Sequence, residues 1–291
     1  MGEGLDRPAV EAERGMFRLP PRPRDSHKGD YGRLFILAGS RGYTGAAALC
    51  AKAAVRSGAG LVTLAVPEDV YPILAAKCCD EVMVWPIPED DGAVVEKARG
   101  CDAAVIGPGL GQGERAEGLV LRLMKELPCP VILDADGLNI ISRHIDVLDE
   151  RAGDTVLTPH EGEFARLSGC PLPIADRLGA ARDFAMAHRC TLVLKGHRTV
   201  TACPGGDCVV NPTGNPGMAR GGSGDALAGL LGALTAQGRY GLPVHGAVWI
   251  HGRAGDLAAA DKGEYGMTPS DLIEQIPYAI KELINNEEES G

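Results

Sequence analysis

The repeated alternation of short apolar runs with segments of helical spacing is the pattern that most constrains this chain. Runs such as RLFILAGS, LVTLAVPE and CDAAVIGPGLG each stop at glycine or proline. Segments with helical spacing follow them, for example TGAAALCAKAAVRSGAG and ERAEGLVLRLMKEL. This succession is typical of a largely parallel sheet with helices on both faces. We therefore predict an α/β fold with a largely parallel central sheet.

The alternation continues to about residue 285 without a linker or an internal repeat. It predicts a single domain over residues 25–291. The preceding residues 1–24 have no such pattern and lead into the proline-rich stretch LPPRPRDSHKGDYG. We expect them to form an irregular N-terminal arm.

Net charge and cysteine content indicate which kinds of partner and which cellular compartment to expect. The formal net charge is -10, and no long basic run is present, so a nucleic-acid partner is not expected. The nine cysteines are odd in number, scattered and free of C-x-x-C pairs, which favours a reducing compartment. The N-terminus has no apolar signal segment, and no apolar run is long enough for a bilayer span. We expect a cytoplasmic protein with no membrane partner.

Polar and glycine-rich motifs follow the predicted strands. In open parallel sheets, ligands bind beyond the carboxyl ends of the strands. Five motifs fall at such ends, which predicts one large site at one edge of the sheet: residues 107–111, 134–139, 158–163, 195–199 and 211–225.

The stretch GGSGDALAGLL places one carboxylate, Asp225, in the first turn of a predicted helix. Glycines let backbone N–H groups approach a phosphate, and the helix N-terminus favours an anion. A carboxylate beside such a site can take a proton from a hydroxyl that attacks a phosphoryl group. The alternative is an ordinary first-turn aspartate after a tight glycine turn.

The other motifs each allow more than one interpretation. VIGPGLGQG lacks the G-x-G-x-x-G spacing, and no P-loop G-K-[ST] occurs, so classical Rossmann and Walker-type nucleotide sites are disfavoured. Asp134 and Asp136 share a face if their strand continues, and they form either a capped turn or part of a metal or phosphate site. His160 is a general acid or base, a partner of a substrate, or part of a helix N-cap after Pro159. A strand-end lysine such as Lys195 is usually solvated.

Taken in chain order, six stretches between about residues 25 and 285 resemble the ADP/ATP-dependent NAD(P)H-hydrate dehydratase family, which repairs nicotinamide cofactors and belongs to the ribokinase-like superfamily. The stretches are HKGDYGRLFILAGSRGYTGAAALCAKAAVRSGAGLV, GPGLG, ILDADGLN, LTPHEGEFARL, LVLKGHRT and GNPGMARGGSGDALAGLLGAL. The resemblance implies a ribokinase-like fold. It also implies that (S)-NADHX and (S)-NADPHX, the hydrated cofactors, are returned to NADH and NADPH by phosphorylation of the ring hydroxyl and elimination of phosphate.

The resemblance also implies roles for individual residues. Asp225 would be the catalytic base, beside an anion hole formed by the amides of Gly222, Ser223 and Gly224. Contacts to the hydrated cofactor would come from Ala46, Gly111, His160 and Asp225. Contacts to the AMP part of the nucleotide would come from Lys195, Gly196, His197, Arg198, Thr199 and Gly224. Many ribokinase-like kinases read N-x-x-E where this chain reads HEGE, so Glu163 is assigned to magnesium, which phosphoryl transfer requires for charge neutralisation.

The co-substrate and partners follow from the same resemblance. Bacterial and archaeal members use ADP and eukaryotic members use ATP, and the short chain without targeting features favours ADP. Relatives form homotetramers, and the functional partner is an NAD(P)HX epimerase, for which the N-terminal arm is too short. Two other functions stay open. One is a kinase of the same fold acting on a small alcohol of the hydroxyethylthiazole or hydroxymethylpyrimidine type. The other is a catalytically silent nucleotide-binding module, against which Asp225 argues.

Overall fold

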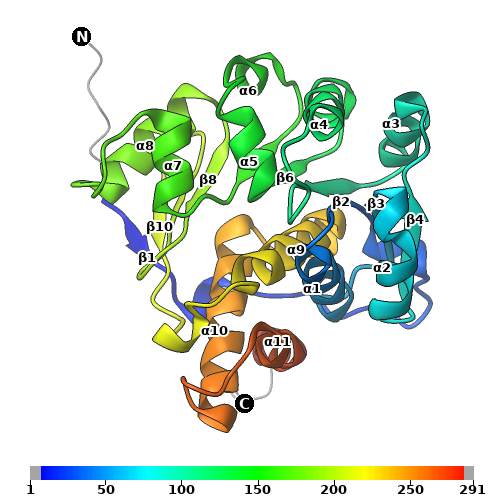
Figure 1. The fold of residues 1–291 in the computed structure, drawn as a ribbon. Helices are drawn as coiled ribbons and strands as arrows, with labels where there is room; N and C mark the ends of the chain where they lie inside the picture. Colours follow the sequence, from blue (N-terminus) through cyan, green and yellow to red (C-terminus); the bar gives the residue numbers. More distant parts are fainter. Residues whose placement is uncertain (1–7, 285–291) are drawn as a thin grey trace.

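A ten-stranded sheet forms the centre of the computed structural model, which describes residues 8–284 (Figure 1). The strand order is β1-β10-β9-β8-β7-β6-β5-β2-β3-β4. Of these strands only β9 runs opposite to the others. The strands are β1 (Val10–Glu11), β2 (Arg33–Leu37), β3 (Leu61–Val66), β4 (Val82–Pro86), β5 (Ala103–Ile106), β6 (Val131–Leu133), β7 (Thr155–Leu157), β8 (Thr191–Leu194), β9 (Val200–Ala202) and β10 (Cys208–Val210).

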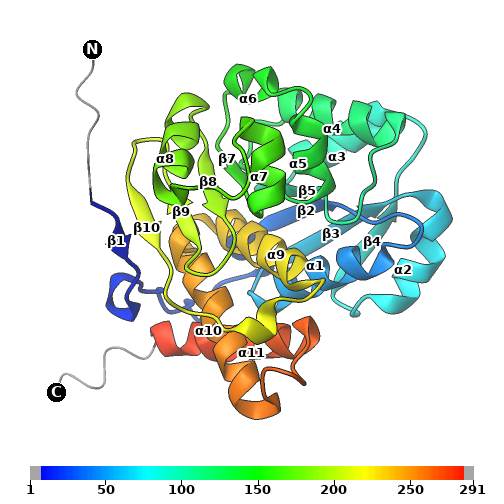
Figure 2. The same ribbon diagram turned by 60° about the vertical axis from the view of Figure 1, so that its left-hand side comes forward.

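Helices cover both faces of this sheet (Figure 2). One face carries α1 (Thr44–Arg56), α2 (Tyr71–Lys77), α9 (Ser223–Ala236), α10 (Val244–Lys262) and α11 (Pro269–Ile284). The other carries α3 (Asp91–Arg99), α4 (Glu114–Glu126), α5 (Asp136–Ile141), α6 (Asp146–Glu150), α7 (Glu161–Ser168) and α8 (Arg177–Ala187). The predicted α/β architecture is confirmed.

Strand β2 shows why the apolar runs are continuous rather than alternating. Successive side chains of a strand point to opposite faces of the sheet. Leu34 and Ile36 belong to the core on the α9 side, whereas Phe35 and Leu37 belong to the core on the α4 side. Because helices cover both faces, every one of these positions is apolar and buried.

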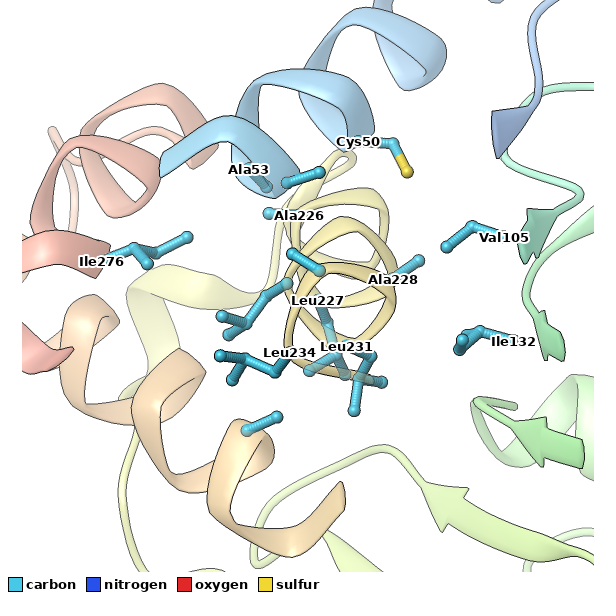
Figure 3. Close-up of a cluster of buried hydrophobic side chains, with 14 of the residues drawn as sticks. Cys50, Ala53, Val105, Ile132, Ala226, Leu227, Ala228, Leu231, Leu234 and Ile276 are labelled. Carbon is cyan, nitrogen blue, oxygen red and sulfur yellow. The ribbon is translucent and has the colours of Figure 1, made fainter. Parts of the chain in front are cut away.

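Helix α9 lies between the sheet and the outer helices, and its small residues allow close packing on several sides (Figure 3). Cys50 and Ala53 of α1, Val105 and Ile132 of the sheet, and Ile276 of α11 surround it. At Gly229 an added Cβ would lie 2.0 Å from the carbonyl oxygen of Cys50, so α1 and α9 touch through their backbones. This packing fixes the position of the α9 N-terminus relative to the strand ends.

The N-terminal arm differs from the expected irregular segment. Residues 1–7 lie outside the described part, but β1 pairs with β10 and Arg14–Met16 form a short 3-10 helix. Phe17 is buried, with ring centroids 5.6 Å from His245 and 6.1 Å from Trp249. A two-residue strand is too short to give a periodic pattern, whereas Phe17 supplies enough apolar area to anchor the segment.

Within residues 8–284 no helix combines the length and apolar character that a bilayer crossing requires.

Candidate active site

The predicted motifs follow neighbouring strands of the sheet. Residues 107–111 follow β5, residues 134–139 follow β6, residues 158–163 follow β7 and residues 195–199 follow β8. These four strands are parallel and lie side by side in the order β8-β7-β6-β5. The loops therefore meet at the carboxyl edge of the sheet. The fifth motif, residues 211–225, follows β10 and ends in the first turn of α9.

A buried ion pair lies at this edge. Lys195 Nζ is 2.7 Å from Asp134 Oδ1 and 3.9 Å from Glu163 Oε2. Thr158 Oγ1 donates to the same Asp134 oxygen at 2.8 Å. The interpretation of Lys195 as a solvated strand-end lysine is therefore wrong, since its side chain is only 20% exposed and pairs with carboxylates. The neighbouring carboxylates raise the pKa of Lys195 against the lowering effect of burial, so the ammonium stays charged.

Asp134 and Asp136 do not share a strand face. Strand β6 ends at Leu133, Ala135 adopts a φ of 48°, and α5 begins at Asp136. Asp134 points to Lys195, whereas Asp136 Oδ2 accepts a hydrogen bond from the Gly111 amide at 2.8 Å. The β-to-α turn after Leu133 thus sends the two carboxylates to different parts of the edge.

Helix α9 brings Asp225 to the ion pair. The helix follows Gly222, whose φ of 106° favours glycine, and Asp225 is its third residue. A Cβ added at Gly224 would lie 3.2 Å from Lys195 Nζ and 3.9 Å from Asp134 Oδ2. Burial and the Asp134 carboxylate raise the pKa of Asp225 from 3.8 to about 6, although Lys195 opposes the increase. Asp225 is therefore a carboxylate that binds and releases a proton near neutral pH.

The backbone before α9 offers N–H groups to an anion. Ser223 N donates to the Arg220 carbonyl at 3.3 Å. The amides of Gly222 and Gly224 donate to no acceptor among the described residues. Because a helix N-terminus carries partial positive charge, these two amides can hold a phosphoryl oxygen. The anion hole expected from three amides thus has one member that is already engaged in the protein.

His160 and Glu163 form the N-terminal cap of α7. His160 Nδ1 accepts from the amides of Gly162 and Glu163, at 3.0 and 3.3 Å. Glu163 Oε2 in turn accepts from the His160 amide at 2.9 Å. Of the alternatives for His160, the N-cap position is the one found, and its ring is 57% exposed with Nε2 3.6 Å from Glu163 Oε1. The outer ring nitrogen therefore stays accessible to a ligand.

The acidic residues do not form a metal-binding cage. Among residues 8–284, no three His, Cys, Asp or Glu side chains are grouped so that they could hold a metal ion. Mg²⁺ takes six oxygen ligands and is often held by one or two carboxylates together with substrate phosphates and water. Glu163 and Asp134 fit that mode, in which the nucleotide supplies most of the ligands.

Ala46 and Gly111 lie on the α1 side of the same edge. A Cβ added at Gly109 would lie 3.0 Å from the Ala46 Cβ, which places the 107–111 loop against α1. Ala46 and Leu49 are three residues apart and share a helix face. A Cβ added at Gly222 would lie 2.6 Å from Leu49 Cδ1, so that face of α1 adjoins the start of α9.

Residues 195–199 form the turn between β8 and β9. Lys195 N donates to the Pro159 carbonyl at 2.8 Å, and Thr199 Oγ1 donates to the Gly196 carbonyl at 3.0 Å. His197 is exposed, and the Arg198 guanidinium pairs with Glu11 of the N-terminal arm. Of the side chains in this segment, that of Lys195 points to the carboxylates and that of Arg198 to the arm.

Three residues that support the site were missed in the sequence. His251 of α10 is buried, its Nε2 lies 2.9 Å from the Ser223 carbonyl, and burial lowers its pKa to about 4. A neutral His251 thus donates to the first turn of α9. Asp256 Oδ2 accepts from the Gly214 amide at 3.0 Å, and Arg177 donates to carbonyls of the 195–199 turn. The signal for the first two was a histidine and an aspartate in the otherwise largely apolar and small-residue stretch HGRAGDLAAA.

Comparison with known proteins gives matches over nearly the whole chain. A family model described as NAD(P)H-hydrate dehydratase matches residues 34–278. A bifunctional NAD(P)H-hydrate repair enzyme from Gloeobacter violaceus is 49% identical over 245 residues, which are 82% of this chain and 47% of that protein. The chain spans about half the length of such bifunctional curated relatives.

Two solved structures share the fold. A ribokinase-like superfamily protein from Enterococcus faecalis has a TM-score of 0.83 and 28% identity, over 97% of this chain and 99% of that one. An ADP/ATP-dependent NAD(P)H-hydrate dehydratase from Bacillus subtilis, co-crystallized with ATP/Mg²⁺, has a TM-score of 0.78 and 33% identity, over 93% of this chain and 95% of that one. The predicted ribokinase-like fold is therefore confirmed.

Proposed function

The chain belongs to the NAD(P)H-hydrate dehydratase family, and from this membership we propose that it repairs hydrated nicotinamide cofactors. Its substrates are (S)-NADHX and (S)-NADPHX, and its products are NADH and NADPH. A nucleoside phosphate is consumed in the reaction, ADP in preference to ATP. The kinase alternative, with a small alcohol as substrate, is less well supported because the relatives over most of the chain are dehydratases and repair enzymes.

The observation that carries the proposal is that Asp225 lies in the first turn of α9, near the buried Lys195–Asp134 ion pair and close to two amides without an acceptor among the described residues. The Asp225 carboxylate takes the proton of the ring hydroxyl, and the hydroxyl oxygen attacks the terminal phosphoryl group of ADP, which leaves as AMP. The amides of Gly222 and Gly224 donate hydrogen bonds to the phosphoryl oxygens and stabilise the negative charge that develops there. The carbon–oxygen bond of the phosphorylated ring then breaks, a proton leaves the neighbouring ring carbon, and the double bond is restored as phosphate departs.

The remaining residues bind and orient the two substrates. The turn of residues 195–199, together with Gly224, holds the AMP part of the nucleotide. Ala46, Gly111 and the outer nitrogen of His160 contact the hydrated cofactor. Mg²⁺ neutralises the nucleotide phosphates when it is bound with them, and Glu163 and Asp134 are the residues that would hold it or its waters.

Four further expectations belong to this proposal. Residues 25–291 form one domain, an expectation that the single continuous sheet of the described residues supports. The protein acts as a homotetramer in the cytoplasm. Its functional partner is an NAD(P)HX epimerase.

The test is direct. The protein is mixed with (S)-NADHX, Mg²⁺ and either ADP or ATP, and recovery of the reduced-nicotinamide absorbance is followed. We expect recovery with a higher initial rate for ADP, and no recovery without nucleotide. Absence of recovery with both nucleotides contradicts the proposal. Accumulation of a stable phosphorylated alcohol, without restored cofactor, would instead support the kinase alternative.

A further inference from the structure

The side chain of Arg177 is bound to the backbone of the 195–199 turn. Arg177 is the first residue of α8, directly after the N-cap Asp176. Its Nη1 donates to the His197 carbonyl at 2.8 Å, and its Nη2 lies 3.2 Å from the carbonyls of both Leu194 and Lys195. One guanidinium therefore donates hydrogen bonds to three carbonyl oxygens at the end of β8 and in the turn that follows.

The guanidinium offsets two unfavourable features of the turn, the repulsion between its carbonyl oxygens and the positive φ of Arg198. Carbonyl oxygens that converge on one place repel one another unless a cation or several donors lie between them. Arg198 also adopts a φ of 56° in this turn, a conformation that a non-glycine residue rarely adopts. The planar guanidinium offers several donors in fixed directions and stays charged at all relevant pH values. It can therefore hold the turn in a shape that the sequence of the turn does not favour on its own.

The other side of the same guanidinium reaches the His160 loop. Arg177 Nε lies 3.0 Å from Glu161 Oε1, an ion pair without the alignment of a hydrogen bond, and Glu161 directly follows His160. The two loops also touch through their backbones, because His160 and Lys195 form an isolated parallel bridge. Arg177 thus joins the turn assigned to the nucleotide with the loop assigned to the hydrated cofactor. Its side chain is 23% exposed.

We propose that Arg177 is a positioning residue that holds the 195–199 turn ready for the nucleotide and links it to the His160 loop. The identity of the ligand rests on the proposed function, but the contacts do not. The guanidinium is occupied by carbonyls and by Glu161, so it acts on the nucleotide through the turn. A preordered turn binds its ligand without paying the entropy of ordering.

The test compares Arg177→Ala and Arg177→Lys with Arg182→Ala. Arg182 is a matched control because it lies on the same helix and its Nε donates to a different turn, at the Gly206 carbonyl and 3.1 Å. Amide hydrogen exchange is measured across the full chain, and ADP affinity is measured by calorimetry without the hydrated cofactor. For Arg177→Ala we expect faster exchange in residues 195–199 and ADP binding weakened about tenfold, as the loss of charged hydrogen bonds implies.

The controls separate positioning from general stability. Arg182→Ala is expected to speed exchange near residues 203–207 and to leave ADP affinity within about twofold of the wild type, since that turn lies outside the site. Arg177→Lys keeps the charge but not the planar fork, so its ADP affinity is expected between those of the wild type and Arg177→Ala. If Arg177→Ala does not fold, Arg177→Lys carries the test.

The proposal is overturned if the folded Arg177 variants bind ADP as tightly as the wild type, or if exchange in residues 195–199 is unchanged. Failure of the wild type to bind ADP or ATP has a different meaning, because it contradicts the proposed function. In that case the exchange comparison still decides whether Arg177 orders the turn.

Discussion

Replacement of Asp225 by asparagine is expected to lower turnover by about 10²–10⁴ and to stabilise the fold. The pKa of Asp225 rises from 3.8 to about 6, mainly because the carboxyl is buried and lies near Asp134. Each pKa unit corresponds to about 1.4 kcal/mol. Keeping this carboxylate ionised in the folded protein therefore costs about 3 kcal/mol. Asparagine has nearly the same shape and no charge, so Asp225→Asn removes that cost.

The pH dependence of this stabilisation follows from the direction of the shift. Between pH 3.8 and about 6 the folded wild type keeps a proton that the unfolded chain has released, so wild-type stability falls as pH rises through this window. Above about pH 6 the free-energy cost of the ionised, buried Asp225 no longer changes with pH. The advantage of Asp225→Asn should therefore be near zero at about pH 4, grow through about pH 6 and reach at most about 3 kcal/mol at about pH 8.

The assay is urea unfolding of both proteins at about pH 4, 6 and 8, with Asp80→Asn as the control for loss of an exposed carboxylate. In parallel, turnover of (S)-NADHX should fall by about 10²–10⁴, the usual contribution of a general base, while ADP still binds. An Asp225→Asn protein that is less stable than the wild type at the highest of these pH values refutes the reasoning about burial. Full turnover in that variant removes Asp225 from its role.

Three other changes test separate features of the site and the fold. The pH profile of kcat/KM should fall about tenfold per pH unit below about 6, where Asp225 is protonated, and a profile that stays flat to about pH 4 would contradict this. Lys195→Met leaves Asp134 buried without its cation and should lower the free energy of unfolding by about 3–5 kcal/mol in chemical denaturation; it should also shift the acid limb to higher pH, because Lys195 lowers the pKa of Asp225. Gly229→Ala should lower the free energy of unfolding by about 1–3 kcal/mol, because its Cβ would meet the α1 backbone. The control Gly118→Ala, at a helix position with open space, should leave it unchanged or raise it by up to about 1 kcal/mol. Equal thermal shifts for the two variants would argue against the close packing of α1 and α9.

The strand order could not be predicted from the sequence, but the fold class could. Apolar runs such as β2 identify strands that are buried on both faces, whatever their neighbours are. Nothing in the runs specifies that β2 lies between β5 and β3, because that depends on contacts far apart in the chain. The two-residue strand β1 gave no periodic signal, and only its pairing with β10 reveals it.

The site was predictable where backbone geometry dictates residue type. The glycine turn before Asp225 was predictable, because the φ of 106° at Gly222 favours glycine, whereas anion binding at this helix start stays a prediction. The ion pair of Lys195 with Asp134 was not predictable, since the two residues are 61 positions apart and meet only because β8, β7 and β6 are parallel neighbours. Arg177 gave no signal either, because its function depends on carbonyls of another segment.

In the proposed reaction, the ring hydroxyl is phosphorylated before it leaves. The most direct measurement follows a heavy oxygen isotope placed in the hydroxyl of (S)-NADHX through one turnover with ADP and Mg²⁺. Phosphorylation of the hydroxyl requires the label to appear in the inorganic phosphate, in a one-to-one ratio with restored NADH. Label found in water, with unlabelled phosphate, would show that the carbon–oxygen bond breaks without phosphoryl transfer and would contradict the proposed roles of Asp225 and the α9 amides.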